Sequence, residues 1–174
     1  MLLKIADRID TLNEWVGRGT AWLTLIMALV MFLTVVLRYV FNMGWIWMQE
    51  SVTFMHGIIF MMAAGYTLLH EQHVRIDIFY RPMSIRRKAL VNIFGVLFLL
   101  FPTCYVVSHY SLPYVANSWA VFEGSKEAGG LPGVFLLKTV VPIFAVLLGL
   151  QGVSTLIRSC RDAFSPKAVP SSSR

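Results

Sequence analysis

Long apolar stretches recur along this chain and are separated by shorter polar segments. Four of them, residues 20–37, 51–69, 89–108 and 134–157, contain almost no charged residue. At a rise of ~1.5 Å per residue, the nineteen residues of the second stretch extend about 28 Å, close to the ~30 Å hydrocarbon core of a bilayer. The pattern predicts an all-α membrane protein with four transmembrane helices. We expect one domain over residues 1–165 and a disordered tail over residues 166–174.

Residues 1–19 have a different pattern. Apolar side chains recur there at steps of three and four, in the order Leu2, Ile5, Ile9, Leu12 and Val16. This spacing predicts a short amphipathic helix, which we expect to lie in the membrane interface with Trp15 as its anchor. A secretory signal peptide is the competing interpretation. The acidic residues before the apolar run and the lack of a clear cleavage site argue against it.

The first two connections carry distinct signals. Trp45, Trp47 and Glu50 form an aromatic and acidic collar at the start of the second span. After that span, apolar and mostly charged residues alternate over residues 74–81, which predicts an extended piece. Ser84 then has the position of an N-cap for the third helix.

The third span and the connection after it each have a feature that predicts irregular structure. Pro102 lies inside the third span and should kink it, because proline has no N–H to donate to the carbonyl of Phe98. Residues 111–133 form the longest connection. They are too apolar for a solvated linker, so we expect a re-entrant or interface-lying segment with Trp119 at headgroup level.

Composition agrees with a lipid environment and charge suggests an orientation. The chain is 57% hydrophobic and only 14% charged, which is too apolar for a soluble domain of 174 residues. Its net charge of +6 does not predict nucleic-acid binding, because no nucleic-acid motif accompanies it. Twelve basic residues fall on the side of the two termini and the second connection, and three on the other. This bias predicts that both termini lie in the cytoplasm.

The spans lack the residues that membrane chemistry needs. Proton, ion and substrate paths across a bilayer use ionisable side chains, and here Arg38, Glu50 and Lys138 all fall near the outer boundary. The sequence has no P-loop, and nothing in it suggests a metal or cofactor requirement. The chain is therefore expected to be a non-catalytic partner of another protein.

Small residues on one stripe of the second span suggest close helix packing. Gly57, Ala64 and Gly65 share a face with Glu50. Small side chains let helix backbones approach closely in membranes. The sequence leaves two alternatives: these residues pack inside the four-helix unit, or they lie at an interface with another subunit.

Two further pairs of residues have candidate roles. Arg38 and Glu50 come at the same ends of neighbouring spans and are predicted to form an ion pair, with a lipid phosphate as the rival partner of Arg38. His56 and His109 both fall toward the outer side, so a shared haem is the alternative worth stating. On that alternative, the chain is a haem-binding anchor subunit of a redox enzyme.

Several of these residues together resemble a known family. Arg38 ends the first span, Trp47 and Glu50 open the second, and GYTLLHEQHVRID follows from Gly65 to Asp77. This pattern is similar to the small membrane subunit of tripartite ATP-independent periplasmic (TRAP) transporters, the DctQ-type family. The later WAVFEGSKEAGGLP and LQG segments are similar to the subgroup labelled for mannitol or chloroaromatic compounds.

The resemblance implies a place in a larger assembly. A periplasmic solute-binding protein captures an organic acid or a related solute, and a large membrane subunit moves it by an elevator motion driven by sodium. The small subunit is a scaffold in the bacterial inner membrane, in contact with the large subunit, the binding protein and lipid. The resemblance gives His70, His73, Arg75 and Asp77 as a cytoplasmic family motif, and it implies no cofactor.

Overall fold

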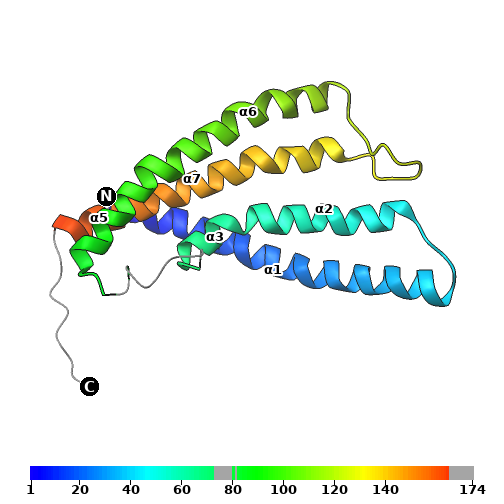
Figure 1. The fold of residues 1–174 in the computed structure, drawn as a ribbon, viewed down its shortest axis with the longest axis horizontal. Helices are drawn as coiled ribbons and strands as arrows, with labels where there is room; N and C mark the ends of the chain where they lie inside the picture. Colours follow the sequence, from blue (N-terminus) through cyan, green and yellow to red (C-terminus); the bar gives the residue numbers. More distant parts are fainter. Residues whose placement is uncertain (73–79, 81, 165–174) are drawn as a thin grey trace, which may run out of the picture.

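The computed structural model describes residues 1–72, 80 and 82–164, and most of these described residues are helical, with no strand among them. The elements, shown in Figure 1, are α1 (Leu2–Val40), α2 (Ile46–Met62), α3 (Ala64–Leu69), α5 (Ile85–Gly95), the π-helix η1 (Val96–Leu100), α6 (Phe101–Ala120) and α7 (Val134–Phe164). They join into four helices long and apolar enough to cross a membrane, at Leu2–Val40, Ile46–Leu69, Ile85–Ala120 and Val134–Phe164. The predicted fold class is confirmed.

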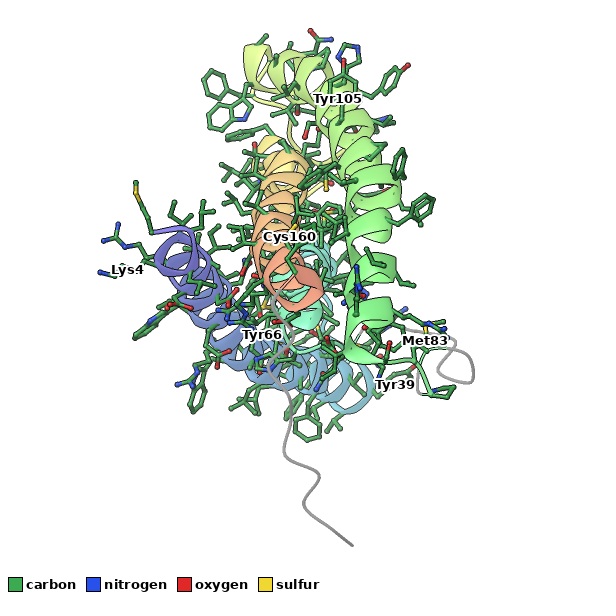
Figure 2. All side chains as sticks on the ribbon, turned by 90° about the vertical axis from the view of Figure 1, so that its left-hand side faces the viewer. Lys4, Tyr39, Tyr66, Met83, Tyr105 and Cys160 are labelled. Atoms are coloured by element: carbon green, nitrogen blue, oxygen red, sulfur yellow. The ribbon has the colours of Figure 1, made fainter. Side chains whose placement is uncertain are left out.

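Helix α7 is the centre of the bundle. It packs against α1, α2, α3, α5 and α6, and Figure 1 shows it running between α6 and the α1–α2 hairpin. In its most apolar eighteen residues 33% are buried, compared with 6% in α1 and in the α2–α3 span. The other helices turn most of their apolar surface outward, and Figure 2 shows side chains projecting from all of them. Lipid or partner proteins must cover that surface.

The N-terminal segment and the first span form one helix, which corrects the expectation of a short helix before the first span. No proline separates them, and the helix runs without a break through Gly17 and Gly19, so α1 continues over 39 residues. The buried face also differs from the apolar stripe. Ala6, Ile9, Asn13, Gly17 and Thr20 are buried at steps of three and four. Most of the apolar stripe stays exposed, because the small and polar residues of α1 are the ones that fit against α7 and α3.

The start of the third helix follows the predicted capping chemistry. The Ser84 Oγ accepts a hydrogen bond from the N–H of Arg87, and this confirms Ser84 as the N-cap of α5. Further along, η1 ends one residue before Phe101, and the N–H of Phe101 bonds to the carbonyl of Val96. The irregularity near Pro102 is therefore a π-turn that precedes the proline.

The third helix is longer than predicted. Helix α6 continues through Pro113 to Ala120, so the connection to α7 covers residues 121–133 and not 111–133. Ser111, Val115 and Ser118 are buried at helical spacing, and this packing holds the extra turns in place. Phe122 has a φ of 46°, and the N–H of Glu123 reaches back to the carbonyl of Ser118. This left-handed closure ends the helix.

Two sequence predictions fall outside the described residues. These are the extended piece at 74–81, of which only residue 80 is described, and the disordered tail at 166–174. Three members of the motif that ends at Asp77 also lie there: His73, Arg75 and Asp77.

Candidate functional site

A polar cluster joins the first part of α1 to the last part of α7, at one end of the bundle. We call it the α1–α7 cluster, and its members are Asp7, Asp10, Asn13, Gln151, Ser154 and Arg158. Asp10 is its hub. Its Oδ2 lies 2.5 Å from Arg158 Nη2. Its Oδ1 lies 2.6 Å from Ser154 Oγ and 2.9 Å from Gln151 Nε2. The spacing 151, 154, 158 puts the three donors on one face of α7.

Burial makes these contacts important for the association of α1 with α7. Asn13 and Ser154 are 0% exposed and Gln151 is 2% exposed. Asn13 Nδ2 donates to Gln151 Oε1 at 2.8 Å, so the amides form a chain between the helices. A buried polar group without a partner is costly, and these groups satisfy one another almost completely. Among the described residues, Asn13 Oδ1 is the one buried side-chain atom without a partner.

Helix α3 meets α1 through two glycines. A Cβ on Gly65 would lie 2.1 Å from Asn13 Oδ1, and a Cβ on Gly17 would lie 2.2 Å from the Tyr66 ring. The two helices are therefore as close as glycine allows. On the same side, His70 Nε2 lies 2.8 Å from Glu14 Oε2, and the His70 and Tyr66 rings are 4.3 Å apart.

The small-residue stripe of the second span lies largely within these internal contacts. Gly65 is buried against α1, and a Cβ on Gly57 would lie 3.2 Å from the Leu137 side chain of α7. Ala64 is half-buried. The structure therefore places Gly57 and Gly65 at contacts inside the four-helix unit, which is one of the two alternatives left open by the sequence.

A second polar cluster, the loop cluster, lies at the opposite end of the bundle. It comprises Glu50, Ser118, Glu123, Ser125, Leu131 and Lys138, and it fastens residues 121–133 to the helix ends. Glu50 accepts hydrogen bonds from the Ser125 hydroxyl and, at 2.6 Å, from the N–H of Leu131. Lys138 Nζ lies 2.5 Å from Glu123 and 3.9 Å from the centre of the Tyr114 ring.

The electrostatics of the loop cluster favour charged forms. A hydrogen bond from Lys138 is the main cause, and one from Ser118 the second, that hold the pKa of the Glu123 carboxyl below its ordinary value of 4.5. Glu123 is therefore a carboxylate at neutral pH, and its ion pair is retained in mildly acidic conditions. Beside it, Trp119 Nε1 donates to Thr139 Oγ1 at 2.9 Å, so the indole is fixed against the start of α7.

The predicted ion pair between Arg38 and Glu50 is wrong. Glu50 accepts hydrogen bonds from Ser125 and Leu131 of the 121–133 loop, and the Arg38 side chain makes no ion pair or hydrogen bond with any described residue. Successive residues of an α-helix point about 100° apart. Gln49 lines the groove beside Arg38, so Glu50 is directed toward another face, where an amide and a hydroxyl supply its hydrogen bonds.

Replacing Glu50 with alanine should loosen the loop without unfolding the helices. The Leu131 amide loses its carboxylate acceptor, so its hydrogen exchange should become faster by on the order of tenfold. Hydrogen-exchange mass spectrometry of peptides covering residues 121–133 measures this. Glu127→Ala is the matched control, because Glu127 lies in the same loop and its side chain is exposed. Equal exchange in wild type and Glu50→Ala would show that the contact does not order the loop.

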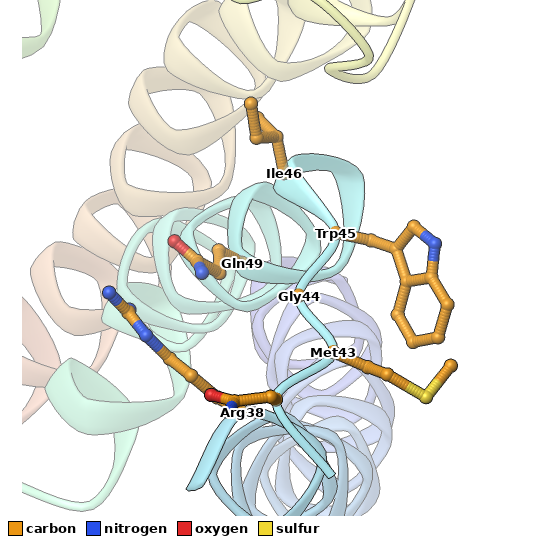
Figure 3. Close-up of a pocket in the computed structure, with 7 residues that line it drawn as sticks. Arg38, Met43, Gly44, Trp45, Ile46 and Gln49 are labelled. Carbon is orange, nitrogen blue, oxygen red and sulfur yellow. The ribbon is translucent and has the colours of Figure 1, made fainter.

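Arg38 instead lines a groove between α1 and α2. One hollow of about 320 Å³ is bordered by Arg38, Asn42, Gly44, Trp45 and Gln49, with Met43 and Ile46 beside them. Figure 3 shows the Arg38 side chain extending toward Gln49, while Met43 and Trp45 point to the other side. A second hollow of about 360 Å³ continues along the helices from Arg38 past Val35 to Met31. Trp47 is exposed in the first turn of α2.

The histidines do not form a facing pair. His56 is an exposed residue of α2, and His109 is an exposed residue of α6 that stacks on Tyr105 at 5.8 Å. The two helices lie on either side of α7 in Figure 1, and each packs on α7. A haem held between two facing helices is not favoured by this arrangement.

The α1–α7 cluster was missed by reasoning from sequence. Its signal is present, because D-x-x-D-x-x-N and Q-x-x-S-x-x-x-R each place polar residues on one helix face. The two patterns are separated by about 140 positions, however, and nothing local pairs them. Gln151 was noted only within the LQG segment.

The fold and its sites define a class of protein. Four long apolar helices, polar clusters restricted to the two ends and a largely apolar exterior describe a multi-pass membrane protein that assembles with others. A family model described as tripartite ATP-independent periplasmic transporters, DctQ component, matches residues 27–162. The chain belongs to this family. It is a small permease subunit of a TRAP transporter, and not an enzyme, and it associates with a large membrane subunit and a periplasmic binding protein. Searches of curated proteins and of solved structures gave no match.

Proposed function

We propose that this chain is a rigid, non-catalytic scaffold for the large membrane subunit of a sodium-coupled transporter in the bacterial inner membrane. The observation that carries the proposal is the placement of charge. The acids and bases of the described helices lie near the ends of the spans, and the stretches between them contain no Asp, Glu, Lys or Arg. A subunit that moved solute or ions itself would need polar groups along its path through the bilayer.

The two polar clusters support the scaffold role. The α1–α7 cluster fixes one end of the bundle, and the loop cluster fixes the other. At and next to the α1–α7 cluster, small residues allow close helix contacts, as at Gly17, Gly65 and Gly152. A bundle held at both ends resists bending, which suits a support for a partner that moves. The exposed apolar side chains supply the surface for lipid and for that partner.

We infer the energy source and the solute class from the family. The family is ATP-independent, so an ion gradient must drive uptake, and we infer sodium as the coupling ion and organic acids or related solutes as the cargo. The excess of basic residues in the segments that adjoin the start of α1 and the end of α7 favours a cytoplasmic location for that end of the bundle. The loop cluster then faces the binding protein on the periplasmic side.

Reconstitution into liposomes tests the proposal. The chain alone should show no sodium-dependent uptake of a labelled organic acid that the binding protein is known to bind. Uptake should require the large subunit, the binding protein and this chain together, and it should disappear when potassium replaces sodium. Uptake by the isolated chain contradicts the scaffold role, and full uptake without this chain contradicts the need for a scaffold.

A further inference from the structure

We propose that the groove between α1 and α2 binds one phospholipid, with its phosphate on Arg38 and an acyl chain along the apolar part of the groove. The proposal goes beyond the subunit's proposed function and does not depend on it. The site is the pair of adjoining hollows that share Arg38 and Gln49. We call this pair the Arg38 groove.

The Arg38 groove contains a positive charge that no described residue neutralises. Arg38 lies in the last turn of α1, and no described residue pairs with its guanidinium. The side chains of Asn42 and Gln49 border the same hollow, and they also form no hydrogen bond with described residues. Three sets of N–H donors therefore converge on one hollow. A phosphate group accepts several such bonds, and arginine binds it through two parallel N–H groups.

This charge has no compensating acid among the described residues of the groove. Within the described part of the chain, neither hollow is lined by Asp or Glu, because Glu50 faces the 121–133 loop. The site therefore has one net positive charge. An anionic headgroup such as phosphatidylglycerol neutralises it, whereas the ammonium of phosphatidylethanolamine adds a positive charge with no acid to receive it.

The shape of the groove also bears on its ligand. The apolar hollow is lined by Met31, Val35 and Val52, with Thr34 and Thr53 beside them. From Arg38 to Met31 is seven residues, or about 10 Å along the helix, from the helix end toward its middle. A headgroup at Arg38 thus places an acyl chain where the groove is apolar. A partner protein is the alternative occupant. Its acidic side chain would pair with Arg38 but would leave the apolar part of the groove empty.

The aromatic residues of the groove indicate its depth in the membrane. Trp45 lines the hollow that contains Asn42, Tyr39 lines the adjoining hollow, and both aromatic residues are exposed. Aromatic side chains of this kind lie at the headgroup level of a bilayer. The Arg38 guanidinium therefore lies at the depth of lipid phosphates when the α1 and α2 spans cross the membrane.

Native mass spectrometry of the purified full-length chain tests the proposal. Dioleoyl phosphatidylglycerol, dioleoyl phosphatidylethanolamine and dioleoylglycerol are each titrated into the detergent-solubilised protein. We expect phosphatidylglycerol to bind best and dioleoylglycerol, which has no phosphate, to bind least. Arg38→Gln should weaken phosphatidylglycerol binding by at least about tenfold, the effect expected from one charge-assisted hydrogen bond.

Two other variants separate charge from shape. Val52→Phe fills the apolar hollow without changing the charge, and it should also weaken phosphatidylglycerol binding. Lys126→Gln is the matched control, because it removes one positive charge from the exposed loop at the same end of the bundle, outside the groove, and it should bind as wild type does. Circular dichroism and the thermal midpoint check that each variant is folded.

Three results would overturn the proposal. Phosphatidylglycerol binding that is equal in wild type and Arg38→Gln would remove the role of the guanidinium. Equal binding of phosphatidylglycerol and dioleoylglycerol would remove the role of the phosphate. Arg38→Gln protein that keeps its lipid but no longer copurifies with the large subunit would identify Arg38 as a protein contact.

Discussion

An Asp10→Ala variant is expected to lose about 3 kcal/mol of unfolding free energy, in the range measured when one partner of a buried ion pair is removed. The carboxylate of Asp10 receives hydrogen bonds from Gln151, Ser154 and Arg158 of α7. Without it, the buried side chains of Gln151 and Ser154 lose an acceptor and Arg158 keeps only Asp7. The Asp10 side chain is 16% exposed and Arg158 is 38% exposed, so water limits the cost to the lower end of the range.

The measurement is the unfolding midpoint of the purified chain in mild detergent, titrated with a denaturing detergent. Asp162→Ala is the matched control, because Asp162 pairs with Arg161 on the exposed surface near the same end of α7, with side-chain exposures of 41% and 50%. An exposed pair of this kind contributes less than about 1 kcal/mol. If Asp10→Ala and Asp162→Ala shift the midpoint equally, the α1–α7 cluster does not hold the two helices together.

The second large effect is expected at Gly17, where alanine should cost about 1–3 kcal/mol, the usual penalty for overpacking a close contact. A Cβ there would lie 2.2 Å from two ring atoms of Tyr66 and 2.6 Å from its Cβ. Because the Tyr66 Cβ is fixed to the backbone, turning the ring cannot relieve the contact. Helix α3 has to move away from α1 instead.

Gly19 offers an internal control only two residues away. A Cβ on Gly19 meets nothing within 4 Å. Gly19→Ala should therefore stabilise α1 by up to about 1 kcal/mol, because alanine is the better helix former. The two substitutions add the same atom to the same helix and should have opposite signs in a thermal unfolding experiment. If Gly17→Ala stabilises the protein as Gly19→Ala does, helix propensity, and not contact with Tyr66, decides the outcome at Gly17.

The features that depend on short stretches of chain could be predicted from the amino-acid sequence. The length and apolar character of a span are local, so the four spans and the overall class could be predicted. The N-cap at Ser84 was predicted for the same reason, because a cap involves only the next few residues. The end of α6 was placed too early, because Pro113 is a local signal for a break and the burial of Ser111 and Val115 outweighs it.

Which polar groups contact one another depends on the packing of helices that are far apart in the sequence. Asp10 and Arg158 are 148 positions apart, and no local pattern indicates that they touch. Glu50 was assigned to Arg38 because the two ends of a hairpin are close, yet the rotation of α2 directs Glu50 to Leu131 and leaves Arg38 beside Gln49. A turn of about 100° per residue is enough to exchange one partner for another. That rotation is set by how α2 packs on α1 and α7, and this packing involves the whole bundle.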